Sequence, residues 1–423
     1  MNDQGAAKYG VRLLVVLALL CAARTAGAQS MDEFFDDSTV HEIRLTLNSK
    51  DWSALKNNFK ENIYYPTALQ WRGVNVSNVG IRSRGQGSRS GTKPGLRVDI
   101  DRYNVDQTFL GLKSFVLDNL VQDPSMLRER LSMAFFRHLG LPAPREAHAR
   151  LFVNGTFAGL YAIVETIDKG FLGRNFGQDS KGGTENDGYL FEYDYTREYR
   201  FENLGSNLDE YKIFDPKTHE NDAAAKIWQP VADLVKAIND TPDAIFEREM
   251  STYLDLTKFV DHIAIENFLA EDDGILGYAG LNNFYFYRFE DSKRSQFLAW
   301  DKDNTFKTLD FDITRNVNDN VLSRRTLAQP QYRNRYFQQL IDAANSAMET
   351  EDGNQGQGQG NSSNRPGWLE REVTRMSAQI RSAGLADNLK PFGNNEFETS
   401  MNDLLIFARE RADFVKARVA ERR

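Results

Sequence analysis

Acidic and amide side chains gather in three short strings in the second half of the chain. The strings are Glu271-Asp272-Asp273-Gly274, Asn282-Asn283 and Trp300-Asp301-Lys302-Asp303. Carboxylate and amide oxygens are hard ligands that suit Mg²⁺ or Mn²⁺ better than zinc. Phosphoryl transfer uses the same parts, because one carboxylate orients the attacking hydroxyl while an Asn and an Asp hold metal across the phosphates. The competing interpretation is that these acids cap helices and turns on a solvated face, since Asp is a common turn residue.

A calcium-binding loop is a further interpretation of the same region. Residues 301–312 begin with Asp-Lys-Asp-Asn-Thr, which resembles the start of an EF-hand loop. Position six of such a loop needs glycine for its sharp turn, and position twelve supplies a glutamate. Those positions hold Phe306 and Asp312 here, so the sequence disfavours a calcium loop.

A glycine-rich segment lies far upstream, between two strand-like runs. It reads Gly85-Gln86-Gly87-Ser88-Arg89-Ser90-Gly91, and Arg82 and Arg84 end the run before it. A strand, a glycine-rich turn and a second strand can close over an anionic ligand, with backbone amides and arginines directed inward. A plain hairpin turn is the alternative, since Gly and Ser are common turn residues.

Three charged residues after this segment suit a nucleotide. Lys93 and Arg97 accompany the next strand, and Glu129 lies on the helix that follows. A strand cation paired with a helix carboxylate can fix the α- and β-phosphates of a nucleotide. The alternative for Glu129 is a simple ion pair with a neighbouring arginine, Arg128 or Arg130.

The elements that must position these residues change in type along the chain. In the first part, hydrophobic periodicity predicts strands at 41–47, 67–71, 79–84 and 95–100, helices at 49–58 and 125–139, and a hairpin of 147–153 and 157–164 around Asn154-Gly155. After Asp168 the pattern predicts helices at 223–239, 242–253, 256–269, 369–383 and 396–420, with a β pair at 283–289 and 296–300. The sequence therefore predicts an α+β protein with a lobe at residues 38–165 and a mainly helical lobe at 166–423. The polar, low-complexity run at 352–367 is predicted to be a flexible insertion in the second lobe.

The first 28 residues have the composition of an export signal. Lys8 and Arg12 precede an apolar run at 13–23, and Ala26-Gly27-Ala28 supplies a small-residue cleavage site. We therefore expect a cleaved signal peptide at 1–28 and a location in the medium, periplasm or cell envelope. Cleavage would remove the only cysteine, Cys21, which excludes disulfides, thiol catalysis and cysteine-based zinc sites from the mature chain.

Net charge, hydropathy and missing motifs argue against several further functional classes: nucleic-acid binding, membrane spanning, and serine or zinc hydrolysis. The chain carries 52 Lys and Arg against 60 Asp and Glu, a net charge of −8, so it has no global basic field for nucleic acid. No later stretch reaches 18 apolar residues, which predicts no stable membrane span after signal cleavage. Neither a Gly-x-Ser-x-Gly nor a His-Glu-x-x-His motif is present to support a serine hydrolase or zinc protease.

Several ordered strings together resemble the CotH family of atypical, secreted protein kinases. They are Val79-Gly-Ile-Arg-Ser-Arg-Gly-Gln-Gly-Ser88, Asp123-Pro-Ser-Met-Leu-Arg-Glu129, Leu141-Pro-Ala-Pro144, Asn154-Gly-x-x-x-Gly-Leu-Tyr161, Val164-Glu-x-x-Asp-Lys-x-Phe-Leu172, Asn283-Phe-Tyr-Phe-Tyr287 and Trp300-Asp-Lys-Asp303. Any one string is common, but the ordered set is specific and runs from about residue 40 to 310.

The resemblance implies a distant protein-kinase-like fold of two lobes. The N-lobe would be β-rich with one main helix, the C-lobe mainly helical, and ATP with Mg²⁺ or Mn²⁺ would bind between them. The acceptor would be a Ser or Thr hydroxyl of an exported protein.

By motif position, the resemblance assigns Asp273 as the catalytic carboxylate and Asn283, Asp301 and Asp303 to the metal. It assigns to the nucleotide Arg84, Gly85, Gly87, Ser88, Lys93, Arg97, Glu129 and Glu165, the last near the lobe hinge. Arg97 stands where many relatives carry the phosphate-facing lysine, which leaves that cation open between Lys93 and Arg97. Asp272 beside Asp273 leaves the catalytic base open by one residue.

Two other functions compete with a kinase. The same fold could serve as a non-catalytic envelope or surface protein for assembly or adhesion, which export and the polar insertion fit equally well. The same acids could also support metal-assisted hydrolysis of a phosphoester. Magnesium-dependent ATP binding separates the enzyme from the scaffold, and free phosphate without a labelled acceptor identifies the hydrolase.

Overall fold

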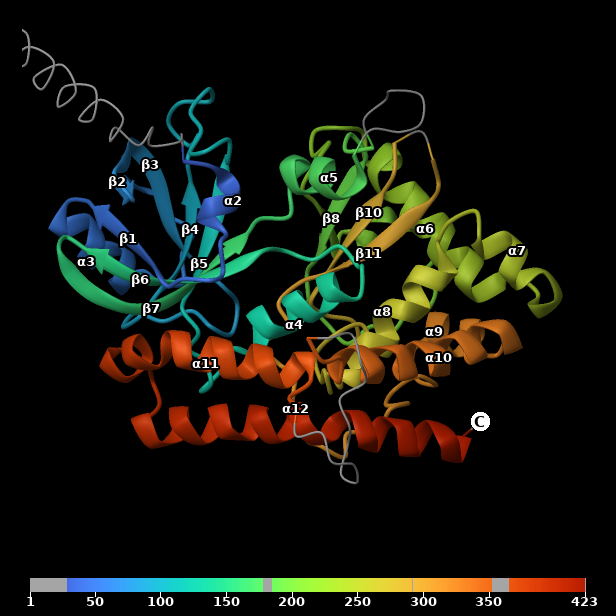
Figure 1. The fold of residues 1–423 in the computed structure, drawn as a ribbon. Coiled ribbons are helices and arrows are strands. Elements are labelled where there is room, and N and C mark those ends of the chain that lie inside the picture. Colours follow the sequence, from blue (N-terminus) through green and yellow to red (C-terminus); the bar gives the residue numbers. More distant parts are fainter. Residues whose placement is uncertain (1–28, 178–184, 291, 352–364, 423) are drawn as a thin grey trace, which may run out of the picture.

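The computed structural model describes residues 29–177, 185–290, 292–351 and 365–422 (Figure 1). The expected signal peptide and most of the expected insertion therefore lie outside the described residues. None of the helices in the described part combines the length and the apolar character that crossing a membrane requires.

The N-terminal lobe is a β-barrel. Seven strands within residues 29–177 close in the order β1-β2-β3-β4-β5-β7-β6. Their bounds are β1 His41–Thr46, β2 Tyr65–Trp71, β3 Val74–Arg84, β4 Gly95–Asp99, β5 Ser114–Asp118, β6 Glu146–Val153 and β7 Thr156–Glu165. Neighbours are antiparallel except β1 and β6, which pair in parallel and close the barrel. The Asn154-Gly155 hairpin is confirmed: both residues have positive φ, 50° and 81°, which a two-residue turn between twisted strands needs.

Aromatic residues fill the barrel. The short helix α2 (Met31–Phe34) inserts Phe34, whose ring makes edge-on contacts with Trp71, Phe109 and Phe115 at centroid distances of 4.9–5.3 Å. Helix α3 (Ser49–Asn57) covers the barrel from outside and contacts β2 and β3. The segment just after the expected cleavage site is thus part of the barrel core.

Helix α4 (Arg128–His138) begins three residues later than the sequence pattern predicts. The Asp123 carboxylate accepts hydrogen bonds from the backbone N–H groups of Ser125, Leu127 and Arg128 at 2.8–2.9 Å. These bonds hold a turn before the helix and satisfy amides that a helix start leaves unpaired. Residues 125–127 are therefore a cap.

The C-terminal lobe combines a small sheet with many helices. The sheet has the order β11-β10-β8-β9. Its strands are β8 Tyr189–Tyr193, β9 Phe214–Pro216, β10 Phe284–Arg288 and β11 Ser295–Ala299. The helices are α5 Lys169–Phe176, α6 Ala224–Asp240, α7 Phe246–Met250, α8 Leu256–Phe268, α9 Val321–Leu327, α10 Pro330–Ala347, α11 Trp368–Ala386 and α12 Asn394–Arg422, with short 3₁₀ turns at Leu208–Tyr211 and Asp243–Ile245.

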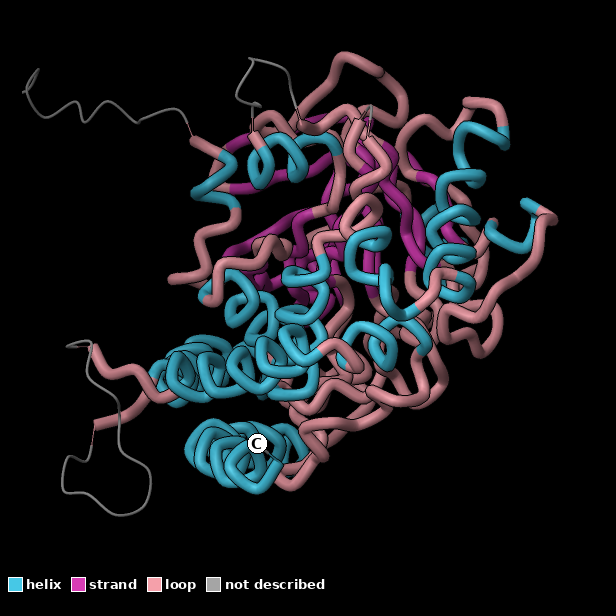
Figure 2. Tube along the Cα trace, turned by 90° about the vertical axis from the view of Figure 1, so that its right-hand side faces the viewer, coloured by secondary structure: helices cyan, strands magenta, loops and turns pink. Residues whose placement is uncertain are grey.

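The last two helices connect the lobes. In Figure 1, α11 and α12 run beneath both the barrel and the C-terminal lobe, and Figure 2 shows them below the strands. α11 contacts β7 and α4, while α12 packs on α10 and α11. One apolar core fills the barrel, and a second runs without a break through α4, the small sheet and these helices. Because this second core also includes Val116, Leu160 and Val164 of the barrel strands, it holds the two lobes against each other.

Candidate active site

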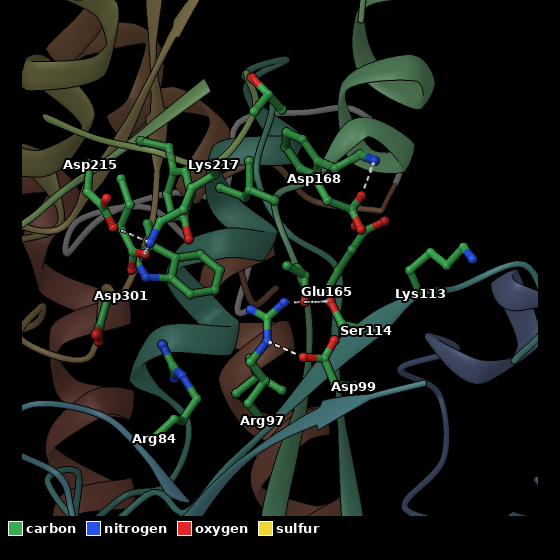
Figure 3. Close-up of a pocket in the computed structure, with 18 of the residues that line it drawn as sticks. Arg84, Arg97, Asp99, Lys113, Ser114, Glu165, Asp168, Asp215, Lys217 and Asp301 are labelled. Atoms are coloured by element: carbon green, nitrogen blue, oxygen red, sulfur yellow. Dashed lines mark hydrogen bonds and ion pairs between the residues drawn. The ribbon is translucent and has the colours of Figure 1, made fainter. Parts of the chain in front are cut away.

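A cleft of about 750 Å³ lies between the barrel and the small sheet (Figure 3). The barrel contributes the ends of β3, β4 and β5, and the chain that leaves β7 forms one wall. The C-terminal lobe contributes residues of β8, β9 and β10 and the residues flanking the β10–β11 hairpin. Arg84 and Arg97 enter from the barrel side, and Asp301 enters from the opposite side.

Two of the three acidic or amide strings meet at this cleft because of how β10 and β11 pair. In this antiparallel pair, Phe284 is opposite Ala299. Asn283 comes directly before β10 and Asp301 comes two residues after β11, so both lie at the same end of the hairpin. Both line the cleft.

The third string reaches the same place through hydrogen bonds. Asp273 Oδ2 accepts from Nδ2 of Asn282 and of Asn283, each at 3.2 Å. The carboxylate of Asp273 also raises the pKa of Asp301, which places their charges within electrostatic reach. The structure therefore brings together Asp273, Asn283 and Asp301, although Asp273 itself does not line the cleft.

Asn283 and Asp301 both adopt left-handed backbone conformations, with φ of 55° and 52°. This region is unfavourable for L-residues, and Asn and Asp tolerate it better than other side chains. Non-glycine residues in this region are concentrated at functional sites. The backbone thus turns sharply at the two positions that present oxygens to the cleft.

The chemistry of these side chains fits a divalent cation. Burial raises the pKa of Asp301 to about 6, and the carboxylates of Asp118 and Asp273 add to the rise while Arg84 opposes it. Carboxylates that repel each other in a partly buried site are stabilised by a cation between them. Within the described ranges, no three His, Cys, Asp or Glu side chains are grouped to hold a metal by themselves. Two protein ligands, with phosphate oxygens and water completing the shell, are the usual arrangement for Mg²⁺ at a nucleotide.

Asp303 lies beside this centre and does not line the cleft. Its Oδ1 accepts a hydrogen bond from the Asn304 side chain at 2.9 Å. Burial raises its pKa well above the ordinary range, and the charges of Asp301 and Asp118 add to the effect. Asp303 therefore lies next to the site with its carboxyl held toward the protonated, neutral form.

A buried ion pair joins the acidic strings from behind. Lys302 Nζ lies 2.7 Å from Glu266 Oε1 on α8 and donates to the carbonyl of Asn283 at 2.8 Å. Glu266 Oε2 accepts from the backbone N–H of Ile275 at 3.0 Å. Both charged side chains are at most 2% exposed. The pair therefore fixes the spacing between residues 271–275, Asn283 and the 300–303 turn.

The sequence left this pair unassigned. Lys302 is visible inside the Trp-Asp-Lys-Asp string, but Glu266 is 36 positions away on a helix that mixes apolar residues with Asp261 and His262. A carboxylate near the end of a largely apolar helix, just before the Glu-Asp-Asp string, was the available signal, since buried charges need partners. Gly274 is a second signal, because a Cβ there would lie 2.5 Å from Glu266 Oε1.

The structure separates the two candidate cations. Arg97 lines the cleft, where its Nε lies 3.4 Å from Asp99 Oδ2 and its guanidinium contacts Ser114 Oγ at 3.4 Å (Figure 3). Lys93 is fully buried outside the cleft and forms a 2.7 Å ion pair with Asp387, just after α11. Only Arg97 of the two is placed to meet a ligand in the cleft.

The glycine-rich turn is held in place by side-chain hydrogen bonds from Arg89 within it and from Asn119 outside it. Gly85 has a φ of 104°, and a Cβ there would lie 2.3 Å from Ser88 Oγ, so this position requires glycine. Arg89 donates to the Gly85 carbonyl at 2.6 Å, and Asn119 donates to the Ser88 carbonyl at 2.9 Å. Gly85 lines the cleft, whereas Gly87 and Ser88 do not. The turn therefore closes only one corner of the cleft.

Arg84, just before this turn, is another cation that lines the cleft. Its guanidinium lies 3.7 Å from Asp118 and 5.6 Å from the centre of the Trp300 ring. Burial opposes its charge, but the carboxylates of Asp118 and Asp301 outweigh burial and raise its pKa. Arg84 therefore stays charged between the barrel and the 300–303 turn.

Glu129 is placed differently from the arrangement that the sequence suggested. It lies at the start of α4, is 8% exposed and does not line the cleft. Burial raises its pKa well above the ordinary range, and the nearby Glu146 carboxylate adds to the rise. The ion pair that Arg97 makes is with Asp99. Glu129 therefore belongs to a buried group of acids behind the cleft.

Glu165 lines the cleft at the end of β7 but is already paired. Its carboxylate accepts from the Arg145 side chain at 2.8 Å and from the Arg145 backbone N–H at 3.0 Å, and it also pairs with Arg174 of α5. Arg145 in turn binds Asp32, near the start of the described chain. Glu165 thus connects the barrel to the first helix of the C-terminal lobe.

A β-barrel lobe that faces a mainly helical lobe across a cleft is the two-lobed arrangement of a kinase-like fold. The chain belongs to the CotH kinase protein family, whose family model matches residues 81–415. The predicted α+β, two-lobed, kinase-like fold is therefore confirmed.

Individual relatives agree with this assignment. The chain is 22% identical over 394 residues to inner spore coat protein H of Bacillus subtilis (strain 168), which spans 90% of this chain and 98% of that protein. It is 36% identical over 60 residues to the inner spore coat protein H-like protein of the same strain, covering 14% of this chain and 20% of that one.

Two solved structures resemble the chain more weakly. One belongs to the complex of the Shewanella oneidensis MR-1 toxin–antitoxin system HipA, HipB and its operator DNA, with a TM-score of 0.35, 11% identity, and coverage of 77% of this chain and 66% of that chain. The other is the Helicobacter pylori proinflammatory kinase CtkA, with a TM-score of 0.26, 12% identity, and coverage of 74% and 93%.

Proposed function

We propose that this protein is an exported kinase that transfers the γ-phosphoryl group of ATP to Ser or Thr hydroxyls of an exported protein. The observation that carries the proposal is that Asn283 and Asp301 line the same cleft as Arg84 and Arg97, with Asp273 hydrogen-bonded to Asn283 just behind the cleft wall. Family membership supports ATP as the donor. Export rests on the composition of residues 1–28 and on similarity to a protein named for the spore coat.

Each residue has a defined task in this reaction. Arg84 and Arg97 bind and orient the phosphates, since charge-assisted hydrogen bonds from arginine suit phosphate oxygens. Asn283 and Asp301, with Asp303 nearby, would hold Mg²⁺ or Mn²⁺, which neutralises charge between the β- and γ-oxygens. Both amide donors bind Oδ2 of Asp273, so we assign Oδ1 to the acceptor hydroxyl. The hydroxyl oxygen bonds to the γ-phosphorus, ADP leaves with the bridging oxygen, and Asp273 Oδ1 takes the proton.

Asp273 suits this task better than Asp272. Asp272 Oδ1 lies 3.1 Å from the Arg315 guanidinium, so its carboxylate is already engaged in an ion pair. Burial raises the pKa of Asp273, although its bonds with Asn282 and Asn283 limit the rise. The structure therefore favours Asp273 as the base.

The direct test is transfer of label from γ-labelled ATP. We expect the purified protein to incorporate phosphate into Ser or Thr residues of itself and of exported proteins, with Mg²⁺ or Mn²⁺ and not with EDTA. Phosphoamino-acid analysis identifies the acceptor hydroxyl. Release of free phosphate without labelled protein would instead indicate a phosphoester hydrolase. No metal-dependent nucleotide binding at millimolar ATP would favour a structural coat or envelope protein, the function that the name of the curated relative suggests.

Two variants decide which cation faces the phosphates. Arg97→Met is expected to weaken Mg–ATP binding by about tenfold or more in calorimetric titration, because it removes a charged donor from the cleft. The paired variant Lys93→Met with Asp387→Asn removes both members of the buried ion pair, so that no charge is left uncompensated. We expect this double variant to change the melting temperature of the protein, while its affinity for ATP stays within about twofold of the wild type. Loss of ATP binding in the paired variant, with normal binding by Arg97→Met, would reverse the assignment.

A further inference from the structure

Helix α12, near the end of the chain, sends one arginine into the interior of the C-terminal lobe. Arg411 is 0% exposed, and its guanidinium donates four hydrogen bonds, all to backbone carbonyls. The acceptors are the carbonyls of Asn267 at 2.7 Å, Phe268 at 2.9 Å, Leu309 at 2.7 Å and Phe311 at 2.8 Å.

These four carbonyls belong to the two chain segments that carry the candidate catalytic residues. Asn267 and Phe268 end α8, and only two residues separate them from residues 271–273. The last carbonyls of a helix have no partner within the helix, and Arg411 supplies one. Leu309 and Phe311 follow the 300–303 turn. One guanidinium therefore ties the chain before Asp273 to the chain after Asp301.

Neighbouring hydrogen bonds reinforce the same connection. The side chain of Asn267 donates to the Tyr336 hydroxyl at 2.8 Å, and that hydroxyl donates to the carbonyl of Ile313 at 2.5 Å. The backbone N–H of Phe306 donates to the carbonyl of Leu269 at 2.7 Å. The two segments thus lie against each other along their length.

The identity of the side chain matters at this position. The guanidinium lies 5.7 Å and 5.1 Å from the ring centres of Phe407 and Phe414 on its own helix, and none of its hydrogen bonds is to a carboxylate. Burying a charge without an opposite charge is costly, so a residue needed only for packing would be apolar here. A planar fork of five donors can serve four carbonyls in fixed directions, whereas an ammonium group has only three rotatable donors.

We propose that Arg411 is a positioning residue of the phosphoryl-transfer site, which sets the distance between Asp273 and Asp301 from behind. This inference rests on the proposed function and extends it, because it makes α12 a part of the active site. Misplacing a catalytic group by about 1 Å lowers rates about 100-fold, so the effect falls on kcat more than on binding of ATP.

The chain offers a matched control in Arg325 of α9. Its guanidinium also donates to carbonyls at a helix end, those of Ile238 and Asn239 in α6 and of Thr241, and it also lies over a phenylalanine, Phe246, at 4.4 Å. Unlike Arg411, it also pairs with a carboxylate, that of Asp243, at 2.7 Å. The α6 end does not lead into the acidic strings. Arg325→Lys therefore disturbs the same kind of cap at a distance from the site.

Arg411→Lys is expected to lower kcat for phosphoryl transfer about 100-fold, with KM for ATP changed less than about threefold. Arg325→Lys should leave kcat within about threefold. In Arg411→Ala, added guanidinium ion should restore part of the lost kcat, whereas methylammonium should not. Equal kcat in Arg411→Lys and Arg325→Lys, after correction for the folded fraction, would overturn the inference.

Hydrogen exchange separates this inference from the proposed function. Arg411→Lys should speed amide exchange about tenfold in peptides covering residues 267–275 and 303–313, and Arg325→Lys should not. This pattern in a protein that transfers no phosphate would support the positioning role and count against the kinase. Unchanged exchange in both regions would overturn the positioning role, whatever the activity.

Discussion

Asp301→Asn is expected to lower phosphoryl transfer about 100- to 1,000-fold while the protein remains folded. The change keeps the size of the side chain and removes the charge that interacts with Arg84 at the cleft, where we propose that the phosphates bind. Loss of one preorganised electrostatic contact to a reacting group typically costs this much in kcat. Asparagine is also the right probe for the backbone, because Asp301 has a φ of 52° and asparagine tolerates this conformation better than alanine.

The same variant should change how stability depends on pH. The pKa of Asp301 is raised from 3.8 to about 6 in the folded protein. Because the folded-state value is the higher one, its contribution to stability is fully present below about pH 3.8 and is lost as the pH rises through about 6. Asp301→Asn cannot lose a proton, so its melting temperature at about pH 8 should exceed that of the wild type by a few degrees, with a smaller difference near pH 4.

Asp303→Asn is the matched comparison for this prediction. Asp303 stands two residues along the same turn but does not line the cleft, so we expect a loss of only about tenfold in kcat. Thermal melts and steady-state rates with Mg²⁺ measure both effects. A fully active Asp301→Asn, or a larger loss in Asp303→Asn than in Asp301→Asn, would contradict the site as we assign it.

Elements with a strong local signal were predictable from the sequence. The Asn154-Gly155 turn needs positive φ at both residues, which this dipeptide favours, and the hairpin formed as expected. The helix at α8 (Leu256–Phe268) also followed its apolar pattern closely. The 242–253 helix was only partly correct: the chain forms a 3₁₀ turn at Asp243–Ile245 and a short helix at α7 (Phe246–Met250).

The sequence did not predict strands that are buried by residues distant in the chain. Strand β8 (Tyr189–Tyr193) is almost fully buried between β9 and β10, so its residues do not alternate between apolar and polar. Strand β5 (Ser114–Asp118) is buried for the same reason, between β4 and β7. Period-two alternation marks only strands with one solvated face, and both strands lack one.

In the candidate site, too, features with a local sequence signal were predictable and features that depend on distant residues were not. The residue types and the hairpin around Asn283 and Asp301 were legible in the sequence, because spacing along two paired strands fixes which ends meet. The sequence did not show whether Lys93 or Arg97 faces the cleft, because the answer depends on Asp387, which lies almost 300 positions beyond Lys93. A lysine on a strand has the same appearance in sequence whether it faces a ligand or a buried aspartate.

Lys302→Met is expected to have the largest effect on stability. Lys302 and Glu266 are at most 2% exposed, and the ammonium lies 2.7 Å from the carboxylate. Removing one member of a buried ion pair leaves the other charge uncompensated and costs about 3–5 kcal/mol, which corresponds to a melting temperature about 10 °C lower for a lobe of this size. The loss should be accompanied by loss of transfer, because Lys302 also holds the carbonyl of Asn283 at 2.8 Å.

The double variant Lys302→Met with Glu266→Gln distinguishes charge from position. Burial alone would raise the pKa of Glu266, but Lys302 and His262 together lower it to about 2. Because the folded-state value is the lower one, this contribution is present above about pH 4.5 and is lost as the pH falls toward about 2. The double variant has no Glu266 carboxylate left without a partner. It should therefore recover most of the melting temperature at neutral pH and show a weaker loss of stability in acid.

Activity should not return with stability in the double variant. The methionine cannot donate to the Asn283 carbonyl, and the backbone turn that presents Asn283 to the cleft loses its support. Lys217→Met is the control: this lysine pairs with Glu192 and Asp215 at the cleft but is 33% exposed, and exposed pairs contribute only about 0–1 kcal/mol. Recovery of both stability and transfer in the double variant would show that Lys302 only balances charge and that the position of Asn283 is set by the β10–β11 hairpin alone.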